Sequence, residues 1–411
     1  MRHRRTCRKE SVMFLRKVAV CVLFALGFAM LIPVAADAQK IELRSAKIYI
    51  REIPPQTDKA MALLETALEK DPGNNDAHYL LGLIHYRKGN FDLMFQNWEA
   101  VTFNDLDKKD KEQFRNTLGS MIRQNYQRGQ QSYEQEKYAD AAQFYDRSVN
   151  ATSLLQDILR SIGKKNEARE ADELEAAKQQ GYLYWGYAAL NSEDYENSRM
   201  ALETLIEADP DRFEAWDGLV NVYYYTQAWD KAIMACDRII ELSEEVDLNT
   251  YLIMRQAYSE VADTAGVITT YERAIEAFPA EKVLYRDLSS IQASRDNLGM
   301  AIEALEKGHA ALPEDQDLLR YLGTYYYNKG LSDRDAGNVE AASAAFNGAV
   351  ESMNKLLALE PNSIEGHDIL GDTYVGLASI ETDDARKMEL FTKGDELQKK
   401  KMELITSGAG M

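Results

Sequence analysis

The sequence predicts an all-α fold, a solenoid of antiparallel helix pairs that repeat at intervals close to 34 residues. Proline recurs after apolar helical segments, at Pro72, Pro210, Pro279, Pro313 and Pro361. After most of these prolines, a large apolar residue is followed three residues later by another apolar residue and then by a small one. Proline is otherwise scarce, with 8 in 411 residues, so little of the chain is typical of linkers. A fixed period of this length indicates a repeat architecture.

The register of the repeat supports this fold. Units begin near residues 179, 213, 248, 282 and 316, at spacings of 34, 35, 34 and 34. The first helix of a unit carries a motif such as Tyr182-x-x-Trp185-Gly186, and the second carries one such as Ala301, Leu305 and Gly308. Small residues allow backbones to approach and large ones fill the space between units, so each unit is stabilised by its neighbours.

These positions resemble the tetratricopeptide repeat over roughly residues 40–405. The resemblance implies a right-handed superhelical solenoid whose concave groove holds a peptide or a partner protein. Further units begin near 75, 122 and 364, and a half-unit at 58–72 precedes them, giving about eight units plus the half-unit. We therefore divide the chain into a signal peptide (1–38), the repeat array (39–405) and a flexible tail (406–411).

The N-terminus has the order of a secretory signal peptide. Seven basic residues lie among the first 17, an apolar run covers 18–36, and Ala36-Asp37-Ala38 follows as a cleavage site. We expect an exported protein, periplasmic or secreted. An uncleaved anchor helix is the alternative, because the run approaches membrane-spanning length. Met13 is an alternative start to Met1.

The charge balance bears on partners. The net charge of −19 becomes −24 when seven basic and two acidic residues leave with the signal. Such a surface repels phosphate backbones and anionic lipids, so we expect no nucleic-acid partner and no membrane insertion after cleavage. It could attract basic partners or divalent cations, or serve only to keep the protein soluble.

Motifs that carry chemistry are missing from the sequence. It has no phosphate-binding Gly-rich loop, no nucleophile elbow, no zinc-binding H-E-x-x-H and no EF-hand loop. His78 and His85 fall at repeat core positions, and Cys236 occupies a packing position, as a buried small hydrophobe does. We therefore predict a non-catalytic protein with no catalytic residues, no cofactor and no metal site.

The period breaks in two places. From 316 to 364 the spacing is 48, and the insertion that includes Leu331–Gly337 predicts two helices that are each two turns longer, about 10 Å. Within 102–191 we predict three long helices, near 110–134, 138–162 and 165–191. These elongated helices near 110–191 and 316–361 are either docking ledges or length variation that the family tolerates.

A set of first-helix residues maps to positions that line the groove in this family. An aromatic groove with amide and guanidinium groups suits an extended peptide, since Tyr offers large contact area at low entropy cost. Asn221 matches one position of the carboxylate clamp of some relatives, but Leu183 and Tyr187 stand where Lys and Asn are needed, so we do not predict that clamp. The groove residues are Tyr79, Tyr86, Arg87, Tyr126, Tyr133, Tyr187, Asn221, Tyr224, Gln256, Arg286, Arg320, Tyr327 and Asn328.

The functional prediction is a protein-protein interaction scaffold of the cell envelope that binds a peptide or partner protein in its concave groove. The alternative is a structural subunit of an envelope assembly or export complex that docks through the elongated helices. The sequence leaves the oligomeric state open.

Overall fold

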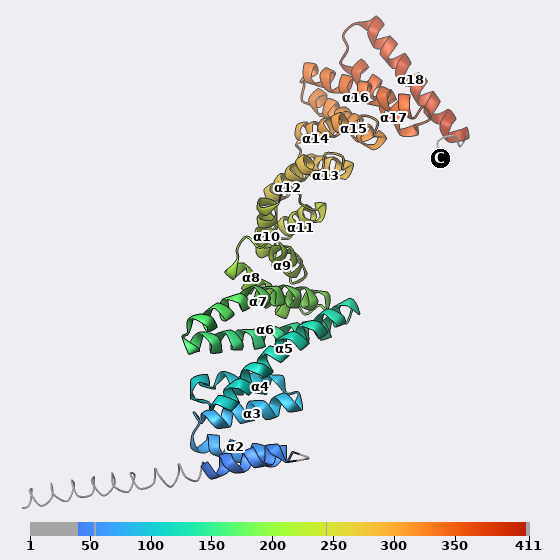
Figure 1. Ribbon diagram of the computed structural model, residues 1–411. Coiled ribbons are helices and arrows are strands. Elements are labelled where there is room, and N and C mark those ends of the chain that lie inside the picture. The colour runs from blue at the N-terminus through green and yellow to red at the C-terminus, as the bar shows by residue number, and fades with distance from the viewer. Residues whose placement is uncertain (1–39, 53–54, 244, 408–411) are drawn as a thin grey trace, which may run out of the picture. The chain divides into compact units, whose positions relative to one another are not determined.

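A computed structural model describes residues 40–52, 55–243 and 245–407, and all elements in these ranges are helical (Figure 1). The all-α array of helix pairs is confirmed. The predicted signal peptide at 1–38 lies outside the described residues. The described residues form two compact units, which meet at residues 218 and 219 within helix α9 (Phe213–Tyr225), and we describe each unit by itself.

The first unit combines short and long helices (Figure 1). A helix covers residues 40–51 and precedes the numbered ones. The others are α2 (Thr57–Lys70), α3 (Asn75–Lys88), α4 (Phe91–Glu99), the 3₁₀ turn η1 (Phe103–Asp105), α5 (Lys108–Glu134), α6 (Tyr138–Ile162), α7 (Lys165–Asn191) and α8 (Tyr195–Ala208).

Three long helices, α5, α6 and α7, begin and end within two residues of the predicted ranges. The Asp107 carboxylate caps the start of α5 by accepting a hydrogen bond from the Asp110 amide at 2.8 Å. Gly163, with φ of 72°, ends α6. The added length is packed: Leu118, Leu159 and Ala171 are fully buried in one core with residues of α3 and α4.

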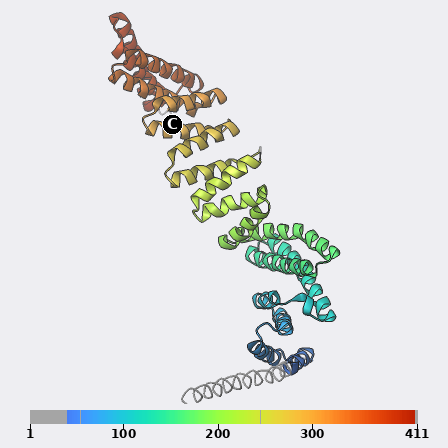
Figure 2. The same ribbon diagram turned by 90° about the vertical axis from the view of Figure 1, so that its left-hand side faces the viewer.

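The second unit contains the rest of α9 and nine further helices, stacked in chain order (yellow to red in Figure 2). Those after α9 are α10 (Trp229–Leu242), α11 (Leu248–Glu260), α12 (Thr264–Ala277), α13 (Lys282–Ser294), α14 (Leu298–Ala311), α15 (Gln316–Asp335), α16 (Val339–Leu359), α17 (Ile364–Ile380) and α18 (Asp384–Ser407). Thr406 and Ser407, which the sequence assigned to the tail, belong to α18.

The turn inside each helix pair repeats with the sequence period. Glu193, Gln227, Ala262 and Asp296 have φ between 58° and 63° and lie 34, 35 and 34 residues apart. The next residue then donates its amide to a carbonyl five residues back, as Asp263 does to Tyr258 at 2.9 Å. This is the Schellman pattern that ends a helix, so each first helix stops in the same way.

The elongation of α15 and α16 is also present, with 20 and 21 residues against 13 or 14 in α11 to α14. Phe346 of α16 is fully buried and packs with Leu377 of α17 and Leu390 of α18. Gly330 of α15 and Gly376 of α17 leave space for its ring. The apolar face of this extension is therefore covered by the last two helices.

No helix in the described ranges is both long enough and apolar enough to span a membrane.

Candidate functional site

The first helices of two adjacent units, α9 and α11, bring three of the predicted groove residues around one cleft. Asn221 and Tyr224 of α9 face Gln256 of α11 across about 200 Å³ of open space. We name this cleft the α9–α11 groove. Its other lining residues are Tyr225, Asn249, Leu252, Ile253 and Arg255.

Exposed apolar area and amides share this groove. Tyr225 is 57% exposed and Leu252 is 39% exposed, and both line the same cleft. The Tyr224 ring is held between Tyr225 and Trp229, with centroids at 5.5 and 5.9 Å. The groove thus presents a fixed aromatic surface beside hydrogen-bonding groups.

Polar contacts orient Gln256 within the groove. Its Nε2 donates to Glu260 one turn further along α11, at 2.7 Å, and its Oε1 accepts from Arg255 at 3.5 Å. An exposed hydrogen bond of this kind contributes little net free energy, because the same groups can bond to water instead. A peptide that replaces these hydrogen bonds therefore costs the protein little stability.

Tyr187 has a structural contact instead. Its hydroxyl donates to the Glu214 carbonyl at 2.8 Å and to the Asp217 carboxylate at 2.9 Å. Burial, and then the negative charge of Asp217, raise the pKa of Tyr187 well above its ordinary value. The Tyr187 side chain therefore links the end of α7 to the start of α9, and its hydroxyl is already hydrogen-bonded within the protein.

The groove assignment of Tyr79 is wrong. Its side chain is 1% exposed, and its ring packs on Phe114 with centroids 5.5 Å apart. Phe114 belongs to the long helix α5, which covers the face of α3 that a regular repeat would leave open.

Two other tyrosines of the first unit pack mainly against rings. Tyr126 contacts Tyr145 and Tyr184 edge to face, at 5.8 and 5.9 Å. Tyr133 packs on Tyr138 at 5.1 Å, and its hydroxyl accepts a hydrogen bond from Asn191 at 2.8 Å. Both remain half-buried and link neighbouring helices.

Tyr86 and Arg87, at the end of α3, lie near a separate surface. Tyr86 lines a cleft of about 540 Å³ whose other residues, Lys109 to Ser120, all belong to α5. The Arg87 guanidinium donates to the Ile50 carbonyl at 3.4 Å. Neither Tyr86 nor Arg87 lines the α9–α11 groove.

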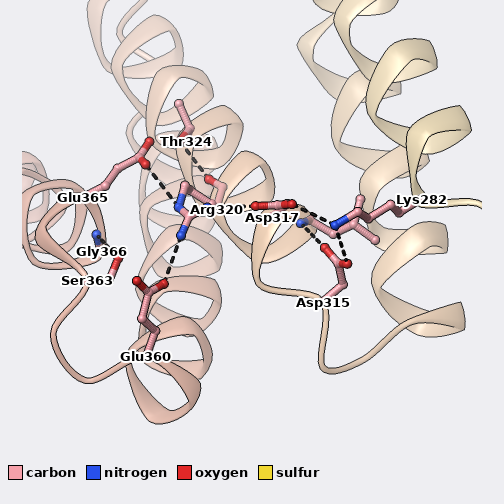
Figure 3. Close-up of polar contacts among 10 residues, drawn as sticks. Lys282, Asp315, Asp317, Arg320, Thr324, Glu360, Ser363, Glu365 and Gly366 are labelled. Carbon is pink, nitrogen blue, oxygen red and sulfur yellow. Dashed lines mark hydrogen bonds and ion pairs between the residues drawn. The ribbon is translucent and has the colours of Figure 1, made fainter. Parts of the chain in front are cut away.

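Arg320 of α15 lies among carboxylates (Figure 3). Its guanidinium is 2.9 Å from Asp317, 3.0 Å from Glu360 and 3.1 Å from Glu365. Lys282 of α13 continues the network to Asp317, at 2.8 Å. These ion pairs connect α13, α15, the α16–α17 loop at Glu360 and the first turn of α17 at Glu365, so Arg320 joins consecutive units.

The remaining predicted residues are dispersed. Arg286 pairs with its neighbour Asp287 at 2.8 Å. Tyr327 packs on Phe346 at 6.1 Å, and Asn328 is exposed on α15. The sequence analysis missed Asn249, Leu252 and Tyr225, although Asn249, Leu252 and Gln256 lie at helical three- and four-residue spacing, which places them on one face of α11.

The histidines and the cysteine have packing roles. The ring nitrogens of His78 lie 2.9 Å from the Pro72 carbonyl and 3.2 Å from Asn97. Burial lowers the pKa of His85, and it raises the pKa of the Cys236 thiol to about 12. Within the part of the chain that the structure describes, no three His, Cys, Asp or Glu side chains are grouped to hold a metal ion.

Several solved structures are similar to parts of this chain. MamA is 23% identical, with a TM-score of 0.31, over 44% of this chain and 95% of its own. YrrB, described as a TPR protein with an unusual peptide-binding site, is 14% identical (TM-score 0.31; 48% and 94% covered). A TPR repeats protein from Bacteroides fragilis is 17% identical (TM-score 0.38; 47% and 97% covered). No curated protein matches the sequence.

The model of the tetratricopeptide repeat family matches residues 56–93 and 183–245. The second segment contains α9 and the start of the turn register, and the same turn geometry recurs to Asp296. The helix pairs, the period and the family match over these two segments agree on the fold, which is an all-α array of tetratricopeptide-type helix pairs.

Proposed function

We propose that this protein is a non-catalytic scaffold whose α9–α11 groove binds an extended peptide segment of a partner protein. The tetratricopeptide fold is itself a protein-interaction scaffold. The observation that carries the proposal is the convergence of Asn221, Asn249 and Gln256 with exposed Tyr225 and Leu252 in one cleft.

The chemistry of the groove suits a peptide backbone. Asn and Gln amides both donate and accept, so they match the alternating N–H and C=O groups of an extended chain. Tyr225 and Leu252 supply apolar contact area for a side chain of the ligand. A cleft of about 200 Å³ holds one or two residues of such a segment, and the rest would run along the first helices.

We place this activity outside the cytoplasm, in the cell envelope, on the basis of residues 1–38. Intact-mass measurement of the protein recovered from the envelope tests this placement. A chain that begins at Gln39 supports it, whereas a chain that keeps residues 1–38 supports the anchor alternative.

Selection of peptides from a displayed random library tests the groove. Peptides selected on the wild-type protein should bind an Asn221→Ala/Asn249→Ala variant about tenfold more weakly, because two backbone-binding amides are gone. Asn328→Ala is the matched control, since it removes the same side chain from an exposed position outside the groove. Peptides that bind all three proteins equally would contradict the proposal.

A further inference from the structure

A second cleft lies in the first unit, between the long helices α5 and α7. It has a volume of about 890 Å³, and its lining also includes η1 and the C-terminal half of α6. Five of its lining residues are basic and three are acidic, in a chain whose net charge is −19. The basic residues are Lys108, Lys111, Arg115, Arg123 and Lys164, and the acidic ones are Glu112, Glu167 and Glu170.

Most of this positive charge is not neutralised. Arg115 pairs with Glu170 across the cleft at 2.8 Å, and Lys111 donates to the Asn104 carbonyl at 2.7 Å. Among the described residues, no carboxylate lies within ion-pair distance of Lys108, Arg123 or Lys164. Cations elsewhere commonly have such partners, as Lys282 and Arg320 do. Glu112 and Glu167 also have no ion pair among the described residues, so the cleft has an excess of two basic residues on an otherwise acidic protein.

The floor of the cleft is apolar and aliphatic. Ile122, Ile162 and Leu174 are half-buried there, beside the nearly buried Leu155. Its one aromatic residue, Phe103, is only 6% exposed, so no ring is available for a nucleic-acid base to stack on. The floor instead suits aliphatic side chains.

The length of the cleft fits a polymer. Lys108 and Arg123 lie 15 residues apart on the same helix, which corresponds to about 22 Å. A single small anion cannot reach both. A chain with several carboxylates can, and its aliphatic side chains would meet the floor.

We propose that this cleft binds an acidic, amphipathic segment of a partner protein. Carboxylates of the segment pair with Lys108, Arg123 and Lys164, and its aliphatic side chains cover Ile122 and Leu174. Glu170 competes for Arg115 in the unbound protein and is displaced when the segment binds. This site is independent of the α9–α11 groove, because all of its residues belong to the first unit.

Fluorescence anisotropy with a labelled peptide of about 20 residues, built from Glu and Leu at helical spacing, tests the proposal. The Lys108→Glu/Arg123→Glu/Lys164→Glu variant should bind it at least about tenfold more weakly than wild type. The control Arg51→Glu/Arg295→Glu/Lys399→Glu changes the net charge equally at exposed positions outside the cleft, and it should bind nearly as wild type. Equal losses in the two variants would overturn the proposal.

Two further binding experiments distinguish a specific site from non-specific electrostatic attraction. Glu170→Gln should strengthen binding about threefold, because it releases Arg115 from its internal partner. Replacing every Leu of the peptide by Ser should weaken binding, whereas oligo-dT should not compete. Competition by oligo-dT as strong as that by the peptide would show a polyanion site instead and would contradict the proposal.

Photocrosslinking locates the bound peptide directly. Gly119 lines the cleft, and its nearest neighbour in the position of an added side chain is Arg123, at 3.7 Å. An azidophenylalanine placed there should crosslink the Glu/Leu peptide, and one placed at exposed Asn328 should not. Crosslinks of equal yield at both positions would count against the cleft.

Discussion

The indole ring of Trp98 lies directly against the backbone of Gly82, so that a Cβ atom on Gly82 would be 2.1 Å from Trp98 Cδ1. Trp98 is fully enclosed, and its Nε1 donates to the Tyr79 carbonyl at 3.2 Å. Helices α3 and α4 can approach this closely only because residue 82 has no side chain.

Gly82→Ala should therefore destabilise the first unit by about 1–3 kcal/mol, as overpacking of a rigid ring does. The higher helix propensity of Ala offsets part of this cost, by up to about 1 kcal/mol. Urea unfolding followed by circular dichroism and tryptophan fluorescence measures the change. Gly119→Ala is the control, because it adds a methyl group on α5 where only the end of Arg123 is near, and it should be neutral or stabilising. Equal effects of the two substitutions would contradict the packing described here.

Asp107→Ala should destabilise α5 by about 1 kcal/mol at pH 7, because it removes the carboxylate that caps the helix. Asp107→Asn keeps an equivalent cap and should be close to wild type. The hydrogen bond from the Asp110 backbone amide holds the pKa of Asp107 below its ordinary value of 3.8. Its contribution is thus complete above about pH 4 and is lost as the pH falls through the lower pKa of the folded state. Unfolding curves between pH 7 and pH 3 should show the wild type converging on Asp107→Ala, and a pH-independent difference would count against this account.

Arg320→Met should destabilise the second unit by about 1–2 kcal/mol, since the side chain is only 25% exposed and joins three carboxylates from consecutive units. Arg286 occupies the same position 34 residues earlier but pairs only with adjacent Asp287, so Arg286→Met should change stability by less than about 0.5 kcal/mol. Thermal unfolding in low salt and in 1 M NaCl separates the two, because salt weakens ion pairs. Equal melting temperatures for the two variants would contradict the claim that Arg320 stabilises the packing of consecutive units.

Cys236 should be inert in the folded protein. It is fully buried in α10, and burial raises its pKa to about 12, so almost none is thiolate at pH 8. With Cys7 and Cys21 replaced by Ser, a chromogenic disulfide reagent should react only after the protein unfolds in urea. Reaction at the rate of a free cysteine under native conditions would show that this packing position opens.

Much of the fold was predictable because its signals are local. Turn residues bound the long helices, and the period of 34 also governs the turn residues from Glu193 to Asp296. The continuous apolar stripe of α16, which includes Phe346, correctly predicted two extra turns. The stripe is covered by the added length of α17 and by Leu390. The sequence did not predict this cover, because residue spacing within one helix does not show which helices pack against it.

The candidate site was predictable only in part. First-helix position identified Asn221, Tyr224 and Gln256, since equivalent positions on adjacent first helices face one cleft. It failed for Tyr79, because the ring of Phe114 from an elongated helix occupies the surface that a regular unit leaves exposed. The sequence analysis did not predict the basic cleft. Its cations come from separate helices, and the sequence does not show which of them lie together or which have a carboxylate partner.

Calorimetric titration of a selected peptide into wild-type protein and the Asn221→Ala/Asn249→Ala variant tests the central claim most directly. The account predicts that the variant binds about tenfold more weakly, that Asn328→Ala binds as wild type, and that all three proteins keep the helical circular-dichroism spectrum of the wild type. Unchanged affinity in the double variant, with its fold intact, would show that the peptide binds outside the α9–α11 groove and would contradict the account.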